Sequence, residues 1–278
     1  MRTISNRWLL TGIAAWFLLC GSLAHAQEAS PVPGSISTLA FFLDSTDTLE
    51  PHAVWISNIL TYRQAQDGKE IDLPALAVSY GIHSEIQVSF SIPYFRSKYG
   101  SDFRINGIGD KFLSVKFQAL NADRRPIGLA FEPVIEILGK GSLAAGELGP
   151  GKYNLALPIL VQKNFERFSL FGEAGYITRR AAFAGIGFDA AVAPKVGVML
   201  NLLYSKSTSF SELSREFGLL QSRADANVGL YYVFKPNLSL FVSGGRTITE
   251  LDPVGTRYIL NFGLNVGFNL RDMLRLRN

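Results

Sequence analysis

Residues 258–270 read YILNFGLNVGFNL, a stretch in which large apolar side chains alternate with small or polar ones. One face carries tyrosine, leucine, phenylalanine and valine, whereas the other carries three asparagines and two glycines, with Ile259 as the exception. Alternation with a period of two predicts a β-strand with two different faces. Because asparagine and glycine offer little apolar surface for a core, the apolar face is expected to point outward to lipid, as in a transmembrane barrel.

The same alternation recurs along the chain, so we predict an all-β fold: a closed antiparallel transmembrane β-barrel of about twelve strands over residues 51–270. Twelve is an even number, as single-chain bacterial barrels require, and most stretches exceed the ~9–11 residues that cross a bilayer with tilt. The polar face of a soluble barrel would meet water instead, so alternation alone does not decide between the two. The expected strands are residues 52–64, 70–82, 84–96, 109–120, 126–139, 151–163, 166–178, 183–191, 195–206, 223–234, 238–249 and 256–270.

The connections between the expected strands alternate in length. Those after even-numbered strands are short, whereas four after odd-numbered strands are longer: Ser97 to Gly107, Lys140 to Pro150, Ser207 to Ser222 and Glu250 to Gly255. Short periplasmic turns on one rim and long extracellular loops on the other are typical of outer-membrane barrels. Amphipathic rings are favoured at the headgroup layer. The tyrosines expected at strand ends on the long-loop side are Tyr62, Tyr94, Tyr153, Tyr176, Tyr204 and Tyr258.

The N-terminus has the three parts of a secretory signal. Arg2 and Arg7 precede an apolar run, Trp8 to Leu19, and Ala24-His25-Ala26 offers a cleavage site, so residues 1–26 are predicted to be a cleaved signal peptide. The run is shorter than the ~20 residues of a membrane-spanning helix. Cys20 is expected to be removed with it, because the leucine before Cys20 does not suit a lipid-attachment site.

Charge and cysteine usage argue against a nucleic-acid-binding protein and against a disulfide-stabilised fold. Loss of Arg2 and Arg7 leaves 25 of 27 basic residues against 23 acidic ones, too even a balance to indicate a nucleic-acid partner. Loss of the single cysteine leaves no disulfide, so closure of the barrel must hold the fold. The lead, residues 27–50, has three open readings: an extra strand, a plug in the lumen or a periplasmic extension. Residues 271–278 form a basic tail.

Three stretches look familiar together: LAVSYGI at 76–82, SEIQVSFSIPY at 84–94 and GIGDKFLSVKF at 107–117. They resemble the "MetA-pathway of phenol degradation" family of proposed outer-membrane transporters. Its usual pattern has one strand ending in Tyr-Gly-Leu, one ending in Pro-Tyr, and Gly-x-Gly-Asp opening a strand with a later lysine. The resemblance covers mostly residues 74–120. It implies an outer-membrane barrel that passes small organic molecules, and it brings no catalytic residues.

The polar faces of the expected strands supply the candidate functional residues, because these faces are expected to line the lumen. The candidates are Trp55, Glu85, Asp110, Phe112, Lys116, Glu132, Glu136, Phe171, Glu173, Arg223 and Asp225. Asp110 and Lys116 share one face and are expected to pair across the lumen. The lumen of a twelve-stranded barrel is wider than that of an eight-stranded barrel, which side chains fill, and narrower than that of a porin with 16–18 strands. We therefore predict a narrow passage for small organic molecules, aromatic or hydrophobic ones included. The alternative is a non-conducting structural or adhesive barrel whose interior is a polar core.

The histidines argue against an enzyme. His52 and His83 both fall at the short-turn rim, away from the long-loop side where a barrel lipid hydrolase would need serine and histidine together. Without cysteine ligands or metal-type histidine spacing, no metal and no cofactor are expected. The expected partners are lipids and lipopolysaccharide of the bacterial outer membrane, its assembly machinery and a small organic solute, with no nucleic acid.

Overall fold

The computed structural model describes residues 43–65, 68–99, 103–139, 153–178, 181–208, 220–251 and 255–270. The predicted signal peptide, the first part of the lead (27–42) and the basic tail (271–278) lie outside these ranges. Within them, no helix is both long enough and apolar enough to cross a membrane.

Fifteen antiparallel strands form one sheet in the described part of the chain. Three crossings are each split by two residues, Gly109-Asp110, Glu132-Pro133 and Leu157-Pro158, so the chain crosses the sheet twelve times, as predicted. The strands are β1 (Ala53–Ala65), β2 (Gly68–His83), β3 (Ile86–Tyr99), β4 (Phe103–Ile108), β5 (Lys111–Leu120), β6 (Gly128–Phe131), β7 (Val134–Ile137), β8 (Tyr153–Ala156), β9 (Ile159–Asn164), β10 (Phe168–Ile177), β11 (Ala181–Ala193), β12 (Val196–Ser207), β13 (Ser222–Lys235), β14 (Leu238–Thr247) and β15 (Thr256–Asn269).

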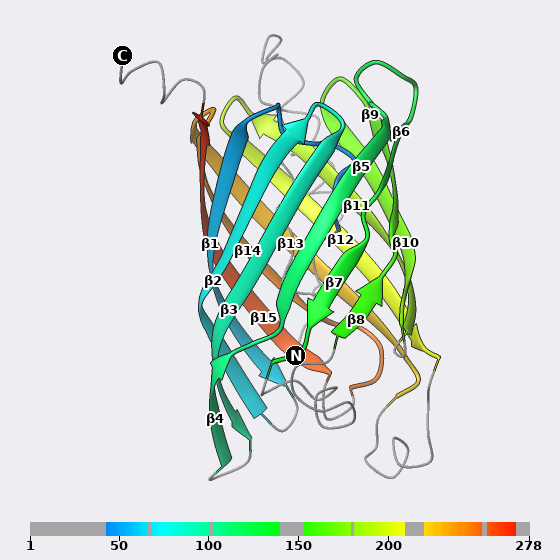
Figure 1. Cartoon of the computed structure of the whole chain (residues 1–278). Coiled ribbons are helices and arrows are strands. Elements are labelled where there is room, and N and C mark those ends of the chain that lie inside the picture. Colours follow the sequence, from blue (N-terminus) through cyan, green and yellow to red (C-terminus); the bar gives the residue numbers. More distant parts are fainter. Residues whose placement is uncertain are drawn as a thin grey trace, which may run out of the picture.

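The sheet closes into a barrel (Figure 1). The first and last strands pair along their whole length, from Ala53 opposite Asn269 to Ala65 opposite Thr256. Every other crossing pairs with its two neighbours in sequence, so the described wall is closed, and β4 extends it at one rim by pairing with β3. Closure supplies backbone partners that hydrocarbon cannot, and it confirms the predicted closed antiparallel barrel.

Two of the three interruptions occur at prolines, which have no N–H to donate to the ladder. The wall nevertheless stays joined there. The Glu132 N–H donates to the carbonyl of Pro158 at 3.2 Å, and the Val115 N–H donates to the carbonyl of Pro133 at 3.2 Å.

The two faces of the wall differ as predicted. On β15, Leu260 is 55% exposed and Phe262 is 48% exposed, whereas Asn261 and Asn265 are each 1% exposed. Ile259 is fully buried, which confirms it as the one large apolar side chain on the otherwise polar inward face of this strand. The large apolar side chains therefore point outward and the asparagines point inward, the arrangement of a barrel in lipid.

One predicted loop is wrong. Residues 97–107 were expected to form a long loop, but β3 continues to Tyr99 and pairs with β4, so most of this stretch is a hairpin that extends the barrel at the long-loop rim. The chain turns back within the hairpin, and Tyr99 lies opposite Phe103. Loops predicted at 140–150 and over most of 207–222 lie outside the described residues.

Inward aromatic rings lie on glycines of the neighbouring strand. Trp55 faces Gly267 and Phe241 faces Gly263 across the ladder. In each pair a Cβ added to the glycine would collide with the ring. Two further pairs of this kind are Tyr231 with Gly197 and Phe171 with Gly187. The rings thus lie along the wall, because the glycines leave room for them.

Gly263→Val is expected to lower the free energy of unfolding by about 1–3 kcal/mol, because the added methyl groups force the Phe241 ring from its place. The measurement is a denaturant titration of the barrel folded in lipid vesicles. Gly244→Val is the matched control: Gly244 is an outward-facing glycine of β14, and its added Cβ would meet nothing closer than Leu260 Cδ2 at 3.4 Å. Equal losses for the two variants would contradict the packing role of the glycine.

Candidate functional site

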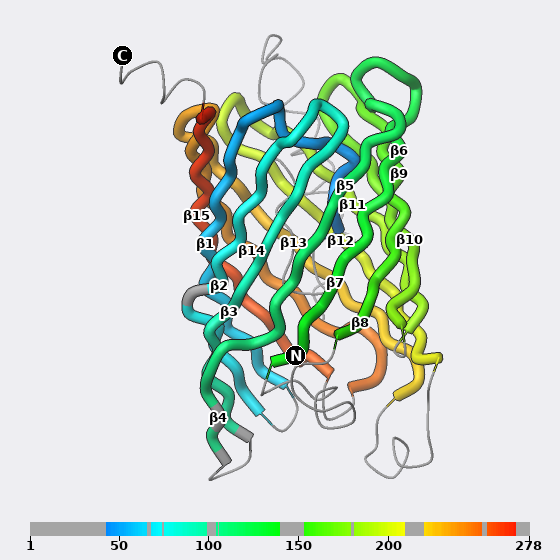
Figure 2. Tube along the Cα trace, viewed as in Figure 1, coloured from blue at the N-terminus to red at the C-terminus, as the bar shows by residue number. Residues whose placement is uncertain are grey.

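The end of the lead, residues 43–50, lies inside the barrel, and we call it the interior segment (Figure 2). It begins near the middle of the wall, where a Cβ on Gly185 of β11 would meet the Leu43 side chain. It ends at the short-turn rim, where the Thr48 hydroxyl donates to the carbonyl of Ser84 at 2.7 Å. The described part of the lead therefore occupies space inside the barrel.

Lys116 of β5 holds the interior segment by its charge. Its side chain is fully buried, and its ammonium lies 2.8 Å from Asp44 Oδ2 and 3.5 Å from Glu132 Oε2. The ammonium also donates to the carbonyl of Ser45 at 2.9 Å. Ser114, two residues earlier on the same face, donates to Glu132 Oε1 at 2.7 Å. A buried charge is costly unless it is paired and hydrogen-bonded, and here both conditions are met.

Glu173 of β10 contacts the interior segment from another part of the wall, three crossings along the sheet from β5. Its carboxylate accepts a hydrogen bond from the Asp44 N–H at 3.4 Å. Asp44 therefore lies between a cation on β5 and a carboxylate on β10, and the segment connects the two parts of the wall.

The uncharged side chain of Gln162 on β9 forms hydrogen bonds with two residues of the interior segment. Its Oε1 accepts from the Thr46 N–H at 2.8 Å, and its Nε2 donates to Asp47 Oδ2 at 3.0 Å and to Asn164 Oδ1 at 2.8 Å. Burial raises the pKa of the Asp47 carboxyl, and the hydrogen bond from Gln162 opposes that shift. Gln118 completes the contacts by donating to the carbonyl of Thr46 at 3.0 Å.

A second polar cluster lies toward the long-loop rim. Arg223 pairs with Asp225 at 2.9 Å, and the Thr247 hydroxyl donates to Asp225 Oδ1 at 2.6 Å. The Thr256 N–H donates in turn to the Thr247 hydroxyl oxygen at 3.0 Å. This cluster joins β13, β14 and β15 at one level of the wall.

The sequence candidates fall into three groups. Lys116, Glu132 and Glu173 gather around the interior segment, and Arg223 and Asp225 form the second cluster. The remaining inward candidates lie along the wall: Glu136 accepts from Asn154 Nδ2 at 2.8 Å, Phe112 lies opposite Glu136, and Trp55 and Phe171 cover glycines.

Two expectations need correction. Glu85 was placed in the lumen, but it lies exposed in the turn between β2 and β3, because β3 begins one residue later. Asp110 was expected to pair with Lys116. Instead, Asp110 Oδ1 accepts from the Gly139 N–H at 2.7 Å, while Lys116 turns to Asp44.

Sequence reasoning did not identify several interior groups. Asp44, Asp47 and Gln162 were not predicted as interior residues, because their partners lie more than 70 residues away in the chain. The Tyr231 hydroxyl donates to Asp189 Oδ1 at 2.8 Å, and both side chains share the inward face that the alternation of β11 and β13 already marked.

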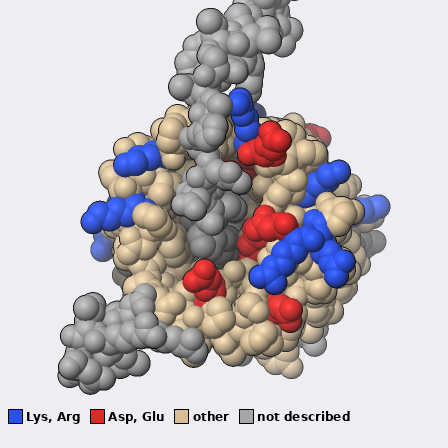
Figure 3. Space-filling view, turned by 90° about the horizontal axis from the view of Figure 1, so that it is seen from above, with Lys and Arg blue, Asp and Glu red and all other residues tan. Residues whose placement is uncertain are grey.

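The interior carries more negative than positive charge. Among the described residues, the buried charged side chains of the wall are Asp72, Glu132, Glu136 and Asp225 against Lys116. At the short-turn end, lysines and arginines lie around the rim and several acidic residues lie nearer the middle (Figure 3). In the described part of the chain, no group of three or more histidine, aspartate or glutamate side chains is arranged to hold a metal ion.

No family model and no curated protein sequence matches the chain. Solved structures with a similar fold include outer-membrane channels. The COG4313 outer membrane channel from Pseudomonas putida F1 has a TM-score of 0.58 and 13% identity over 80% of this chain and 98% of its own. The NanC porin has a TM-score of 0.55 and 9% identity over 76% and 98%, and the KdgM porin a TM-score of 0.51 and 12% identity over 76% and 99%. At these identities the likeness concerns the barrel fold.

Proposed function

We propose that the protein is a narrow channel of the bacterial outer membrane that passes small organic molecules. The observation that carries this proposal is the polar, charged interior of a closed wall whose outer face is apolar. A barrel that served only as an anchor would have no need for buried carboxylates, because burying a charge is costly. The fold shared with outer-membrane channels supports the proposal, as does the resemblance to a transporter family.

The interior also suggests which solutes pass. The four buried wall carboxylates outnumber the two cations paired with them, Lys116 and Arg223, which gives the lumen a net negative potential that attracts cations and repels anions. The flat rings of Trp55, Phe241 and Tyr231 offer apolar surface on the same wall. We therefore propose neutral or cationic organic solutes, aromatic ones included, in preference to organic anions.

In planar bilayers, the folded protein is expected to conduct in discrete steps and to pass K⁺ in preference to Cl⁻, which shifts the reversal potential in a salt gradient. Glu136→Gln should move that reversal potential toward zero, because it removes one interior negative charge. The matched control is Glu166→Gln, which changes an exposed glutamate of the β9–β10 turn. Silence from a demonstrably folded barrel would refute the channel, and anion preference would refute only the proposed solute class. A panel of labelled aromatic cations and anions in vesicle uptake extends the test.

The geometry gives an enzyme little support. His83 Nδ1 lies 3.4 Å from the Ser84 hydroxyl, but both residues are exposed where β2 ends and the turn begins. His52 Nδ1 contacts the Tyr80 hydroxyl at 3.1 Å. Neither pair has the acid that orients a catalytic histidine among the hydrogen bonds of the described residues. Loss of a lipid-hydrolysis activity on replacing either histidine would revive that function.

A non-conducting barrel is the second candidate, because the interior segment is held inside by an ion pair. Bilayer recordings separate the two functions. We propose the same partners for both: outer-membrane lipids and lipopolysaccharide around the wall, and the assembly machinery during insertion.

A further inference from the structure

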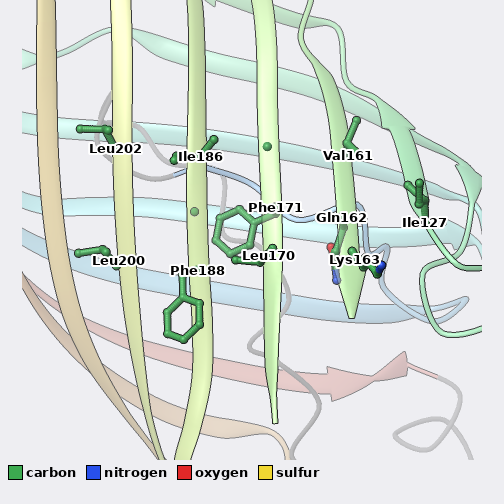
Figure 4. A pocket seen from close by; sticks show the side chains of 12 residues that line it. Ile127, Val161, Gln162, Lys163, Leu170, Phe171, Ile186, Phe188, Leu200 and Leu202 are labelled. Carbon is green, nitrogen blue, oxygen red and sulfur yellow. The ribbon is translucent and has the colours of Figure 1, made fainter. Parts of the chain in front are cut away.

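The outer wall has an apolar groove across β9, β10, β11 and β12 (Figure 4). Gly172 of β10 causes it. Gly172 faces outward and lies opposite Val161 on one side and Ile186 on the other, so a missing side chain separates two large ones. A Cβ on Gly172 would meet nothing closer than the carbonyl oxygen of Gly185 at 3.6 Å, so the space is open.

The lining of the groove is almost wholly apolar. Its volume is about 510 Å³, within the ~300–1,000 Å³ of small-molecule sites. The outward side chains that form its sides are Ile127, Val161, Leu170, Ile186, Leu200 and Leu202. A shape of this kind fits a flexible hydrocarbon chain, which gains by leaving no void against the wall.

One cation borders the groove. Lys163 is two residues beyond Val161 on the outward face of β9, toward the short-turn rim. Its ammonium lies 5.1 Å from the centre of the Phe165 ring, and among the described residues no carboxylate forms an ion pair with it. Two further cations, Arg167 and Lys195, are exposed in the turns above the groove. Figure 3 shows the lysines and arginines spread around this rim.

We propose that the groove binds an anionic phospholipid of the leaflet on the short-turn side. One acyl chain lies in the groove over Gly172, and the phosphate pairs with the ammonium of Lys163. Charge complementarity selects this occupant. A lipid chain accounts for the apolar lining, and an anionic headgroup accounts for a lysine that has no carboxylate partner among the described residues at the end of that lining. The proposal rests on the barrel lying in a membrane, and it does not depend on whether the barrel conducts.

The test is native mass spectrometry of the full folded chain in detergent to which phosphatidylglycerol or phosphatidylcholine has been added. The spectra show how much lipid stays bound when the detergent is removed. The wild-type protein is expected to retain one phosphatidylglycerol more strongly than phosphatidylcholine. Lys163→Gln should lower phosphatidylglycerol retention about five-fold, because a lysine near an anionic headgroup is worth about 1 kcal/mol. Gly172→Leu should lower retention of both lipids by about ten-fold or more, because it fills the groove.

The control is Gly244→Leu, which adds the same side chain to an outward glycine of β14 where a Cβ also finds open space. It should retain lipid as the wild type does, and heat-modifiable migration on a gel shows that each variant is folded. Equal retention by Gly172→Leu and wild type would overturn the proposal, as would equal loss in both leucine variants. Loss of a dimer peak in Gly172→Leu alone would assign the groove to a second copy and also overturn it. Bilayer conductance, recorded separately, tests the channel and leaves this outcome unaffected.

Discussion

Lys116→Met is expected to release the interior segment and to raise single-channel conductance. The substitution leaves Asp44 and Glu132 buried without their cation. Removing one partner of a buried ion pair costs about 3–5 kcal/mol. If that cost falls on the docking of the segment, the equilibrium between inserted and released forms moves by roughly two to four orders of magnitude. A cysteine placed at Ser45 reports the change, because its reaction with a charged thiol reagent should accelerate accordingly.

Two variants sharpen this test. Lys163→Met removes an outward lysine and should change neither labelling nor conductance. The triple variant Lys116→Met, Asp44→Asn, Glu132→Gln replaces the charged set by a neutral one and should recover much of the docking, because no unpaired charge remains buried. Wild-type labelling and conductance in a folded Lys116→Met barrel would show that the ion pair does not hold the segment.

Phe262→Arg is expected to lower the free energy of unfolding by about 2–4 kcal/mol, because it places a charge near the middle of the lipid-facing band. Phe262 is the midpoint of β15, and its ring is 48% exposed on the outer face. The measurement is reversible denaturant unfolding in lipid vesicles. Tyr258→Arg is the comparison, since Tyr258 lies near the long-loop end of the same face and should cost only about 0–1 kcal/mol. If the arginine at 262 cost no more than the one at 258, the outer face would be meeting water.

The wall of the barrel was predictable because its information is local. Alternation along β15 alone separates outward Leu260 from inward Asn261, and each strand repeats that rule. The hairpin of β3 and β4 was missed because Ser97 to Gly107 contains two glycines, two serines, an aspartate and an asparagine, a composition that also suits a loop. Glu85 was misplaced because the strand starts at Ile86 and not at residue 84, which leaves Glu85 in the turn and takes its side chain out of the wall.

The interior was only partly predictable, because its contacts depend on closure. Nothing near Asp44 in the chain indicates that a lysine 72 positions later will lie 2.8 Å away. Lys116 and Glu132 were recognised as inward by their strand positions, but their common partner comes from a stretch without alternation. Alternation with a period of two identifies which side chains of a strand point inward, but it does not indicate which segment of the chain occupies the lumen.

The seam between β1 and β15 sets an order for biogenesis. β1 pairs with β2 on one side and with β15, the last strand to be translated, on the other. Until Thr256 to Asn269 are available, the chain can form only an open sheet with two unpaired edge strands. A polypeptide truncated before residue 256 would keep both edges exposed and be prone to self-association or degradation. Closure of the barrel is thus a single late event. Until then, the assembly machinery must protect the unpaired edge of Ala53 to Ala65 from other strands.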